Sequence, residues 1–280
     1  MSGLLLGFGS SVTWGCADFL GGLKSRQLPL LNVLMGSQLA GLAIITVVVA
    51  VHAADLPAAR FLAFAALSGM AGVVGLAAFY RGLAIGNMAV VAPISSTAAV
   101  IPLVFGIAAG DRPTSVQAAG LGLALAGVVL ASREEVGGGR AGTGVARGAG
   151  LALVSAVGFG LFFVAMDGAS DGDPFWAIFV NRVTAVAILG VAALALRPPL
   201  AAGRRDAATL ALVGVLDITA NSLYAVAATK GLLSLVAVLG SLYPLTTIAL
   251  ARVVLGERPH RVAQAGVVAA LAGVTLIAAG

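Results

Sequence analysis

The chain has 280 residues, of which 60% are hydrophobic and only 10% are charged. A soluble domain is normally about a quarter charged, so this composition leaves too few polar side chains to cover a globule in water. The formal net charge of +5 comes from basic residues in short segments between apolar runs. That distribution is typical of loops that set membrane orientation, and we exclude nucleic acid as a partner.

Ten apolar segments are each close to the roughly 20 residues that a helix needs to cross a bilayer. In chain order they span residues 4–23, 31–51, 61–80, 88–109, 116–132, 148–166, 175–196, 208–228, 232–254 and 262–279. The first segment has no basic leader before it, so we expect a retained span. Gly, Pro and charged residues end most of the segments, as at Gly110-Asp111-Arg112-Pro113. The sequence therefore predicts an all-α membrane protein with ten transmembrane helices.

The ten segments form two similar five-helix halves, 4–132 and 148–278, joined by a polar linker loop at 133–147. A shift of about 145 residues superimposes landmarks of the two halves, which is the signature of an internal repeat. The matched pairs include Trp14 with Phe159, Pro29 with Pro174, Phe79 with Tyr224, and Gly86 with Gly231. Because five is an odd number, the second half must enter the membrane from the opposite side, and we predict an inverted repeat.

Inverted repeats are a common design of secondary transporters, which place one site between two gates. A duplicated scaffold or a membrane enzyme is the alternative. Motifs for metalloproteases, phosphate-binding loops and dinucleotide binding are absent, and both histidines, His52 and His260, lie in loops. The single cysteine, Cys16, cannot form an intrachain disulfide. We therefore expect no enzymatic activity, no cofactor and no metal.

Several short motifs carry a resemblance to a known family. They are Trp14-Gly15, Phe159-Gly160, Gly110-Asp111-Arg112, Gly256-Glu257-Arg258, Arg182, and Ser241-Leu242-Tyr243-Pro244. With these motifs and its doubled five-span pattern, the chain resembles the EamA-type ten-helix members of the drug/metabolite transporter superfamily. The resemblance implies a central cavity surrounded by helices 1, 3, 4, 6, 8 and 9, with helix 7 outside the cavity wall. It also implies transport of amino acids, other metabolites or drugs, without choosing among them.

Ionisable side chains inside a membrane are costly and need a partner, a wet cavity or a function. Asp217 lies near the middle of the eighth span, and Asn221 and Tyr224 follow it on the same helical face. We expect this face to point inward and Asp217 to contact substrate or protons. The alternative for Asp217 is a structural hydrogen bond to a neighbouring helix.

Two further charges lie within predicted spans. Asp18 continues a stripe that contains Trp14, a cavity-wall residue like its counterpart Phe159. Asp18 either lines the cavity or, as we slightly favour, lies near the interface and pairs with Lys24 or Arg26. For Arg182 we expect a structural role, in an intramembrane salt bridge or bonded to backbone carbonyls, rather than binding of a substrate carboxylate.

Prolines mark the fourth and ninth spans, which occupy corresponding places in the two halves. Pro93, Pro102 and Pro244 free backbone carbonyls and permit bending, so they are candidate gating or kink positions. The polar residues near them, Ser95, Ser96, Ser241 and Tyr243, are candidate substrate contacts. The alternative is a packing kink, which is common in membrane helices.

The sequence thus predicts a secondary transporter or facilitator that moves small organic solutes across the cytoplasmic membrane of a bacterium, by export or import. Its partners would be the solute, membrane lipids and protons, with Asp217 or Asp18 coupling transport to a proton gradient; passive exchange is equally allowed. Alternatives are a translocase for lipid headgroups or lipid carriers, and a membrane subunit without transport. Most of the 16 basic residues fall in odd-numbered loops. This bias predicts termini outside the cytoplasm, whereas the resemblance implies cytoplasmic termini.

Overall fold

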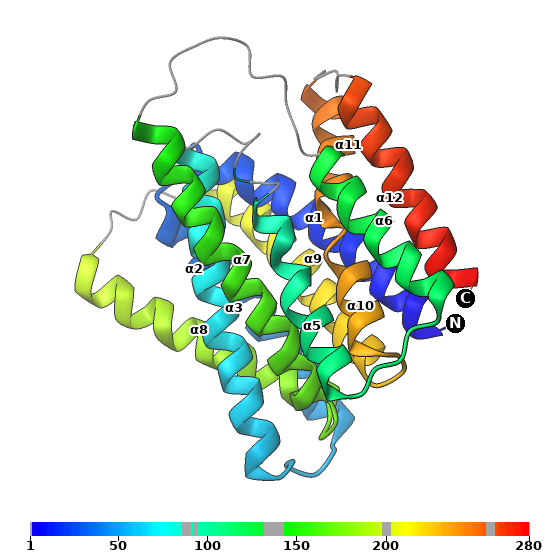
Figure 1. The fold of residues 1–280 in the computed structure, drawn as a ribbon. Helices are drawn as coiled ribbons and strands as arrows, with labels where there is room; N and C mark the ends of the chain where they lie inside the picture. The colour runs from blue at the N-terminus through cyan, green and yellow to red at the C-terminus, as the bar shows by residue number, and fades with distance from the viewer. Residues whose placement is uncertain are drawn as a thin grey trace.

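The structure, a computed structural model, describes residues 2–85, 91, 94–131, 143–197, 203–255 and 261–279, and in these ranges every regular element is a helix (Figure 1). The elements are α1 (Ser2–Ser25), α2 (Leu30–His52), α3 (Ala59–Ile85), η1 (Thr97–Ala99), α5 (Val100–Ala109), α6 (Ser115–Ala131), α7 (Thr143–Ser170), α8 (Pro174–Leu196), α9 (Arg204–Ala228), α10 (Leu233–Gly240), α11 (Tyr243–Leu255) and α12 (Arg261–Ala279). The predicted all-α class is confirmed. Most of the predicted linker, 133–147, lies outside the described residues.

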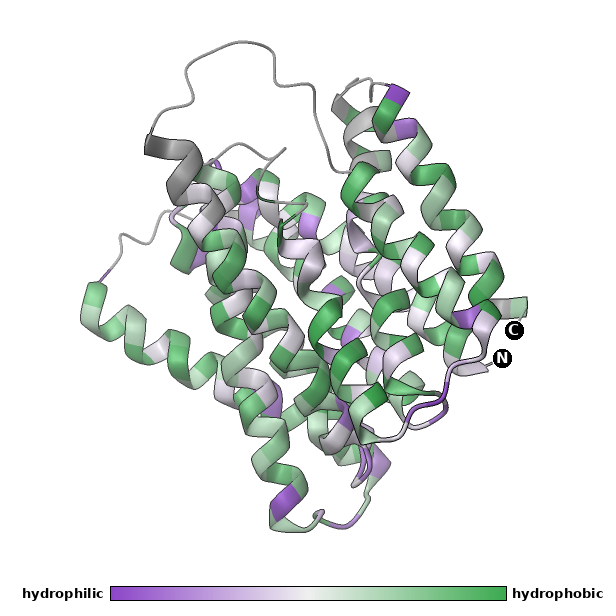
Figure 2. Cartoon of the chain, viewed as in Figure 1, coloured by the Kyte–Doolittle hydropathy of each residue, from purple (hydrophilic) through white to green (hydrophobic). Residues whose placement is uncertain are grey.

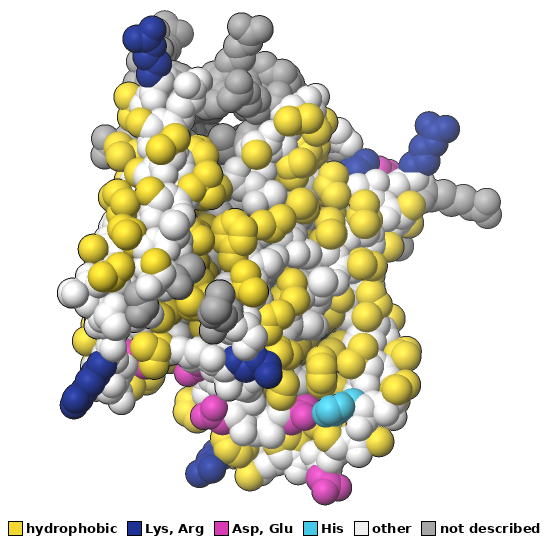
Figure 3. All heavy atoms as spheres, turned by 90° about the vertical axis from the view of Figure 1, so that its right-hand side faces the viewer, with side chains coloured by type: hydrophobic (Ala, Val, Ile, Leu, Met, Phe, Trp, Pro, Cys, Tyr) yellow, Lys and Arg dark blue, Asp and Glu magenta, His cyan; other side chains and the backbone are white. Residues whose placement is uncertain are grey.

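Helix length and apolarity make the chain a multi-pass membrane protein. Five described helices are long and apolar enough to cross a bilayer: Leu30–His52, Ala59–Ile85, Gly150–Ser170, Pro174–Leu196 and Arg205–Ala228. Shorter apolar helices lie beside them, so ten spans stays a prediction. Hydrophobic residues run along the helices in Figure 2. On the face in Figure 3 they cover the middle, while charged side chains lie toward its upper and lower edges, as a bilayer requires.

Loop residues stop and start the helices as their chemistry predicts. Gly110 ends α5 with a φ of 115°, a left-handed conformation that glycine adopts without strain. The next residue, Asp111, accepts a hydrogen bond at 2.8 Å from the backbone N–H of Ser234, in the first turn of α10. Asp173 caps α8 by accepting from the N–H groups of Phe175 and Trp176. The bond between Asp111 and Ser234 connects the two halves.

The predicted spans 88–109 and 232–254 are discontinuous helices rather than single rods. In the first, the short 3₁₀ segment η1 precedes α5; in the second, a turn at Ser241 and Leu242 separates α10 from α11. Pro102 and Pro244 lack the N–H that would bond to the carbonyl four residues earlier, which accounts for a break at each place. Pro93 lies outside the described residues.

Helix pairing is symmetric when the two halves are exchanged. The neighbours α3 and α7 have their counterpart in α9 and α1, and the pair α2–α9 has its counterpart in α8–α3. The pairs α6–α12 and α2–α8 are their own counterparts. This is the pattern expected when two copies of one five-helix unit pack about an approximate two-fold axis.

Small residues allow α6 and α12 to approach closely along the edge of the bundle (Figure 1). A Cβ atom on Gly273 would lie 2.8 Å from the Cα of Ala124 and 2.7 Å from the carbonyl oxygen of Gly120. On the other helix, a Cβ on Gly127 would lie 2.7 Å from the Cα of Ala270. All three distances are too short for real atoms, so backbone-to-backbone packing holds this pair together.

Candidate functional site

A cavity of about 70 Å³ lies between the two halves. This volume admits several water molecules, since one water needs only about 10–15 Å³ on this measure. Its lining residues come from helices of both halves: Trp14, Asp18, Gln38, Gly69, Gly72, Val73, Leu76, Phe159, Phe162, Phe163, Asn181, Arg182, Ala185, Asp217, Asn221 and Tyr243. Polar and aromatic side chains thus converge at one place inside an apolar bundle.

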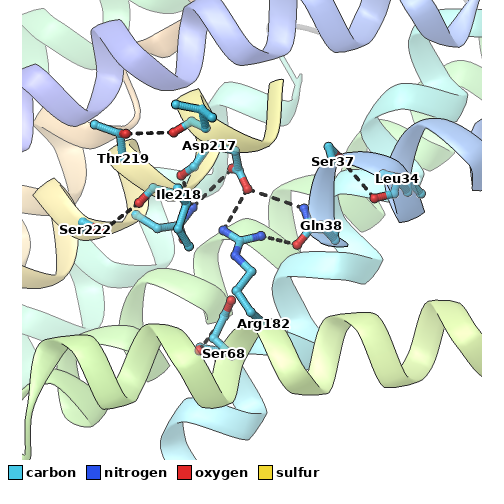
Figure 4. Close-up of polar contacts among 12 residues, drawn as sticks. Leu34, Ser37, Gln38, Ser68, Arg182, Asp217, Ile218, Thr219 and Ser222 are labelled. Carbon is cyan, nitrogen blue, oxygen red and sulfur yellow. Dashed lines mark hydrogen bonds and ion pairs between the residues drawn. The ribbon is translucent and has the colours of Figure 1, made fainter. Parts of the chain in front are cut away.

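An ion pair forms the polar centre of this cavity (Figure 4). The Nη2 atom of Arg182, on α8, lies 2.7 Å from Oδ2 of Asp217, on α9. Gln38 reaches in from α2; its Oε1 accepts from Nη1 of Arg182, and its Nε2 donates to Oδ2 of Asp217 at 3.4 Å. Asn221 donates to Oδ1 of Asp217 at 3.2 Å. Each charge is therefore paired and hydrogen-bonded, which is how charges persist in low dielectric.

The ion pair agrees with the intramembrane salt bridge that was expected for Arg182. It also shows that α8, the seventh predicted span, has a different place from the one that the resemblance implied. The resemblance implied that the seventh span lies outside the cavity wall, and this is wrong: Asn181 and Arg182 of α8 both line the cavity. Asn181 also donates to the hydroxyl of Ser68 on α3 at 2.9 Å. A helix that packs against both α2 and α3 cannot be peripheral to the site.

Asp18 lies inside the bundle, so the favoured location near the interface is wrong. Its side chain is only 8% exposed and lines the cavity. The hydroxyl of Tyr80, on α3, donates to its Oδ1 at 3.3 Å. Tyr80 can reach this position because Gly21, one turn further along α1, has no side chain where the phenol lies. Lys24 instead pairs with Asp206 at 2.7 Å.

Aromatic rings form the rest of the wall. Trp14 contacts Phe162 and Phe163 edge-on, with ring centroids 5.9 and 5.8 Å apart. Tyr243 meets Phe159 at 6.3 Å in the same manner. The buried hydroxyl of Tyr243 has no hydrogen-bond partner in the described part of the chain, although it belongs to a lining residue. This unsatisfied hydroxyl is available to a molecule in the cavity.

Other predicted site residues are buried outside the lining. Tyr224 shares a helix face with Asp217, yet it is fully buried and donates to the carbonyl oxygen of Phe163 at 3.3 Å, so its expected place in the cavity is wrong. Ser241 bonds to the carbonyl of Val238. Four further candidates are buried and do not line the cavity: Ser95, Ser96, Pro102 and Pro244.

The lining residues that were missed from the sequence include two amides, Gln38 and Asn181, and two aromatic residues, Phe162 and Phe163. A signal existed for the two phenylalanines, because they follow the predicted wall residue Phe159 three and four positions later on one helix face. For Gln38 the signal was weaker, namely an amide in an otherwise apolar span.

The two cavity walls that the repeat relates to each other are unequal, and each contains residues of both halves. The 145-residue shift pairs Asp18 with Phe163, Asp217 with Gly72, and Asn221 with Leu76, and all six residues line the cavity. Arg182 corresponds to Ser37, which does not line it. One wall is therefore polar, and the wall that corresponds to it by the repeat is apolar.

Comparison with known proteins agrees with this architecture. No curated protein matches the sequence. One solved crystal structure aligns with 98% of this chain and 96% of its own, with a TM-score of 0.78 and 16% identity, a likeness that shows the fold alone. The model of the EamA-like transporter family matches residues 1–133 and 146–279, one match for each half. The resemblance noted from the motifs is thereby confirmed, and the chain belongs to the EamA-like transporter family.

Proposed function

We propose that the protein is a secondary transporter of small organic solutes in the cytoplasmic membrane, and that the cavity between its halves is the solute site. The observation that carries the proposal is a cavity at the junction of the two repeats that is large enough for several water molecules. It contains a buried ion pair and has an aromatic wall. Membrane proteins retain such buried charges mainly where a substrate or ion must pass. Trp14, Asp18, Phe159, Asp217 and Tyr243 are the proposed solute contacts.

The same proposal includes ten spans arranged as two inverted five-helix repeats. Support comes from the exchange symmetry of the helix pairs and from two family matches, one in each half. Discontinuous helices at corresponding places, η1–α5 and α10–α11, are a recurring feature of such transporters near their sites. Alternating access would then consist of the two halves rocking about the cavity, driven by a proton gradient or by solute exchange.

Solute counterflow tests this function. We expect proteoliposomes containing the wild-type protein, preloaded with one of a panel of amino acids, sugars, nucleosides and organic ions, to accumulate the labelled form of at least one of them. Trp14→Ala should slow that uptake by about tenfold, because the ring is a central part of the wall. Trp176→Phe is the matched control, since Trp176 lies in the first turn of α8, donates to the carbonyl oxygen of Ala54 and does not line the cavity. No uptake of any solute at either of two imposed pH gradients would reject transport.

Orientation in the membrane gives a separate prediction. The excess of basic residues in odd-numbered loops leads us to propose that both termini face away from the cytoplasm. A reporter that is active only in the cytoplasm, fused after Gly280, should therefore give no signal, while the same reporter placed in the linker between the halves should be active. Strong activity of the C-terminal fusion would show that the orientation is the reverse.

A further inference from the structure

The charges that line the cavity are not equally compensated. Asp217 and Arg182 neutralise each other at 2.7 Å, and Gln38 bonds to both. Asp18 has the hydroxyl of Tyr80 as its hydrogen-bond donor and no cationic partner among the described residues. Lys24, on the same helix, is already paired with Asp206. The lining therefore contains one carboxyl group that lacks a counter-charge.

A buried carboxyl group without a counter-charge must bind either a proton or a cation. Arg182 is not the counter-charge of Asp18, because Asp217 already neutralises it, although its buried Nε has no hydrogen-bond partner in the described part of the chain. A substrate carboxylate would therefore have to compete with Asp217 for the charge of this guanidinium. A positively charged solute would find an unpaired counter-ion in the described lining, namely the carboxyl group of Asp18.

The shape of the lining adds a second requirement. Opposite the polar wall lie Phe163, Gly72 and Leu76, and Phe159 and Phe162 extend this apolar surface. Aromatic faces attract cations as well as apolar groups. Trp14 and Tyr243 line the cavity together with Asp18, and the buried hydroxyl of Tyr243 has no partner in the described part of the chain. A ligand that satisfies all of these groups has a positively charged head and an apolar body.

Resting on the proposed function, we propose that the cavity binds monovalent organic cations with an apolar body, and that Asp18 is their counter-ion. Binding exchanges the proton on the Asp18 carboxyl group for the cation, so one proton leaves for each cation bound. The ionisable groups near Asp18 come from neighbouring helices: Tyr80 on α3 bonds to it, and three others line the cavity with it, namely Tyr243 on α11, Asp217 on α9 and Arg182 on α8. The last two compensate each other, which leaves Asp18 as the exchanging group.

Binding to the purified full-length protein tests the proposal directly. In a Trp176→Phe background, Trp14 is the remaining tryptophan, and its fluorescence reports on occupancy of the cavity. The probe is benzyltrimethylammonium, whose charge does not depend on pH. We expect saturable quenching, weaker apparent affinity as pH falls because protons compete, and release of about one proton per bound cation in weak buffer. The neutral N,N-dimethylbenzamide and the anion phenylacetate should bind at least about tenfold more weakly.

Variants assign the effect to one residue. Asp18→Asn should weaken binding by about tenfold and abolish both proton release and the pH dependence. Asp18→Glu should restore both, which separates charge from folding. Asp206→Asn is the matched control, a carboxylate outside the cavity, and should bind as the wild type does. Unchanged binding in Asp18→Asn, or equal binding of the three probes, would overturn the proposal.

Counterflow separates this inference from the proposed function. Exchange of labelled benzyltrimethylammonium by the wild type, but not by Asp18→Asn, supports both. If proteoliposomes exchange neutral or anionic solutes and not the cation, the protein is a transporter and the cation proposal is wrong. If the cation binds with proton release but no solute is exchanged, the binding site stands and the transport function falls.

Discussion

Replacing Arg182 with leucine is expected to destabilise the folded protein by about 3–5 kcal/mol, one of the two largest effects among these predictions. The substitution would leave Asp217 buried without its cation, and Gln38 would lose the donor to its Oε1 while keeping its own weak bond to Asp217. An uncompensated carboxylate in low dielectric costs more than the pair contributes, so the loss should far exceed that of an ordinary packing change. Unfolding in a detergent–denaturant titration measures the difference.

A double variant distinguishes this cause from general disruption of α8. Combining Arg182→Leu with Asp217→Leu removes both charges together, and we expect it to recover most of the lost stability. The neighbouring Asn181→Leu, which loses its bond to Ser68, should cost only about 1–3 kcal/mol. If the double variant were as unstable as Arg182→Leu alone, charge compensation would not be the reason for the loss.

Gly273→Leu should produce the other large effect, because it forces α6 and α12 apart. The first atom of any side chain at Gly273 would overlap the backbone of α6 at Gly120 and Ala124, and backbone cannot yield as a flexible side chain can. Overpacking typically costs about 1–3 kcal/mol, and we expect the upper end of that range for leucine. The midpoint of thermal unfolding in detergent would fall accordingly.

Gly122→Leu is the matched control on the facing helix. A Cβ atom at Gly122 meets nothing within 4 Å, and this exposed position points away from α12. The same substitution should therefore be neutral or slightly stabilising, since leucine favours helix over glycine. Equal losses in the two variants would indicate that helix propensity or lipid exposure, rather than the close approach of the helices, determines stability here.

Local sequence patterns predicted most of the fold because the bilayer imposes a simple rule. Backbone polar groups in lipid must be satisfied within the helix, so apolar length, glycine and proline locate most elements. The repeat shift of 145 residues also predicted the symmetric pairing, since similar units bury similar faces. The breaks at η1 and at Ser241–Leu242 follow from Pro102 and Pro244, but their extent could not be read from proline positions alone.

The site was harder to predict because it depends on contacts between distant helices. Asp18 faces the cavity, and its hydrogen-bond donor, Tyr80, arrives from α3, 62 positions away. Arg182 finds Gln38 across 144 positions, and nothing near either residue in sequence indicates the other. Tyr224 has the right helical phase beside Asp217, but its ring is covered by Trp14 and Phe163, which α1 and α7 bring against it. Helical periodicity identifies a face, whereas the neighbouring helix decides whether that face is open.

The unequal walls of the cavity have a consequence for the path of a solute. Asp18 and Asp217 lie where the repeat places Phe163 and Gly72, so the lining has a definite polarity although the backbone is nearly symmetric. An amphipathic molecule held in such a lining has one preferred direction, with its head toward Asp18. The proposed rocking of the halves would change which mouth is open but would not interchange the walls. A transported molecule would therefore keep its alignment through the cycle, with its charged head on the same wall when it enters and when it leaves.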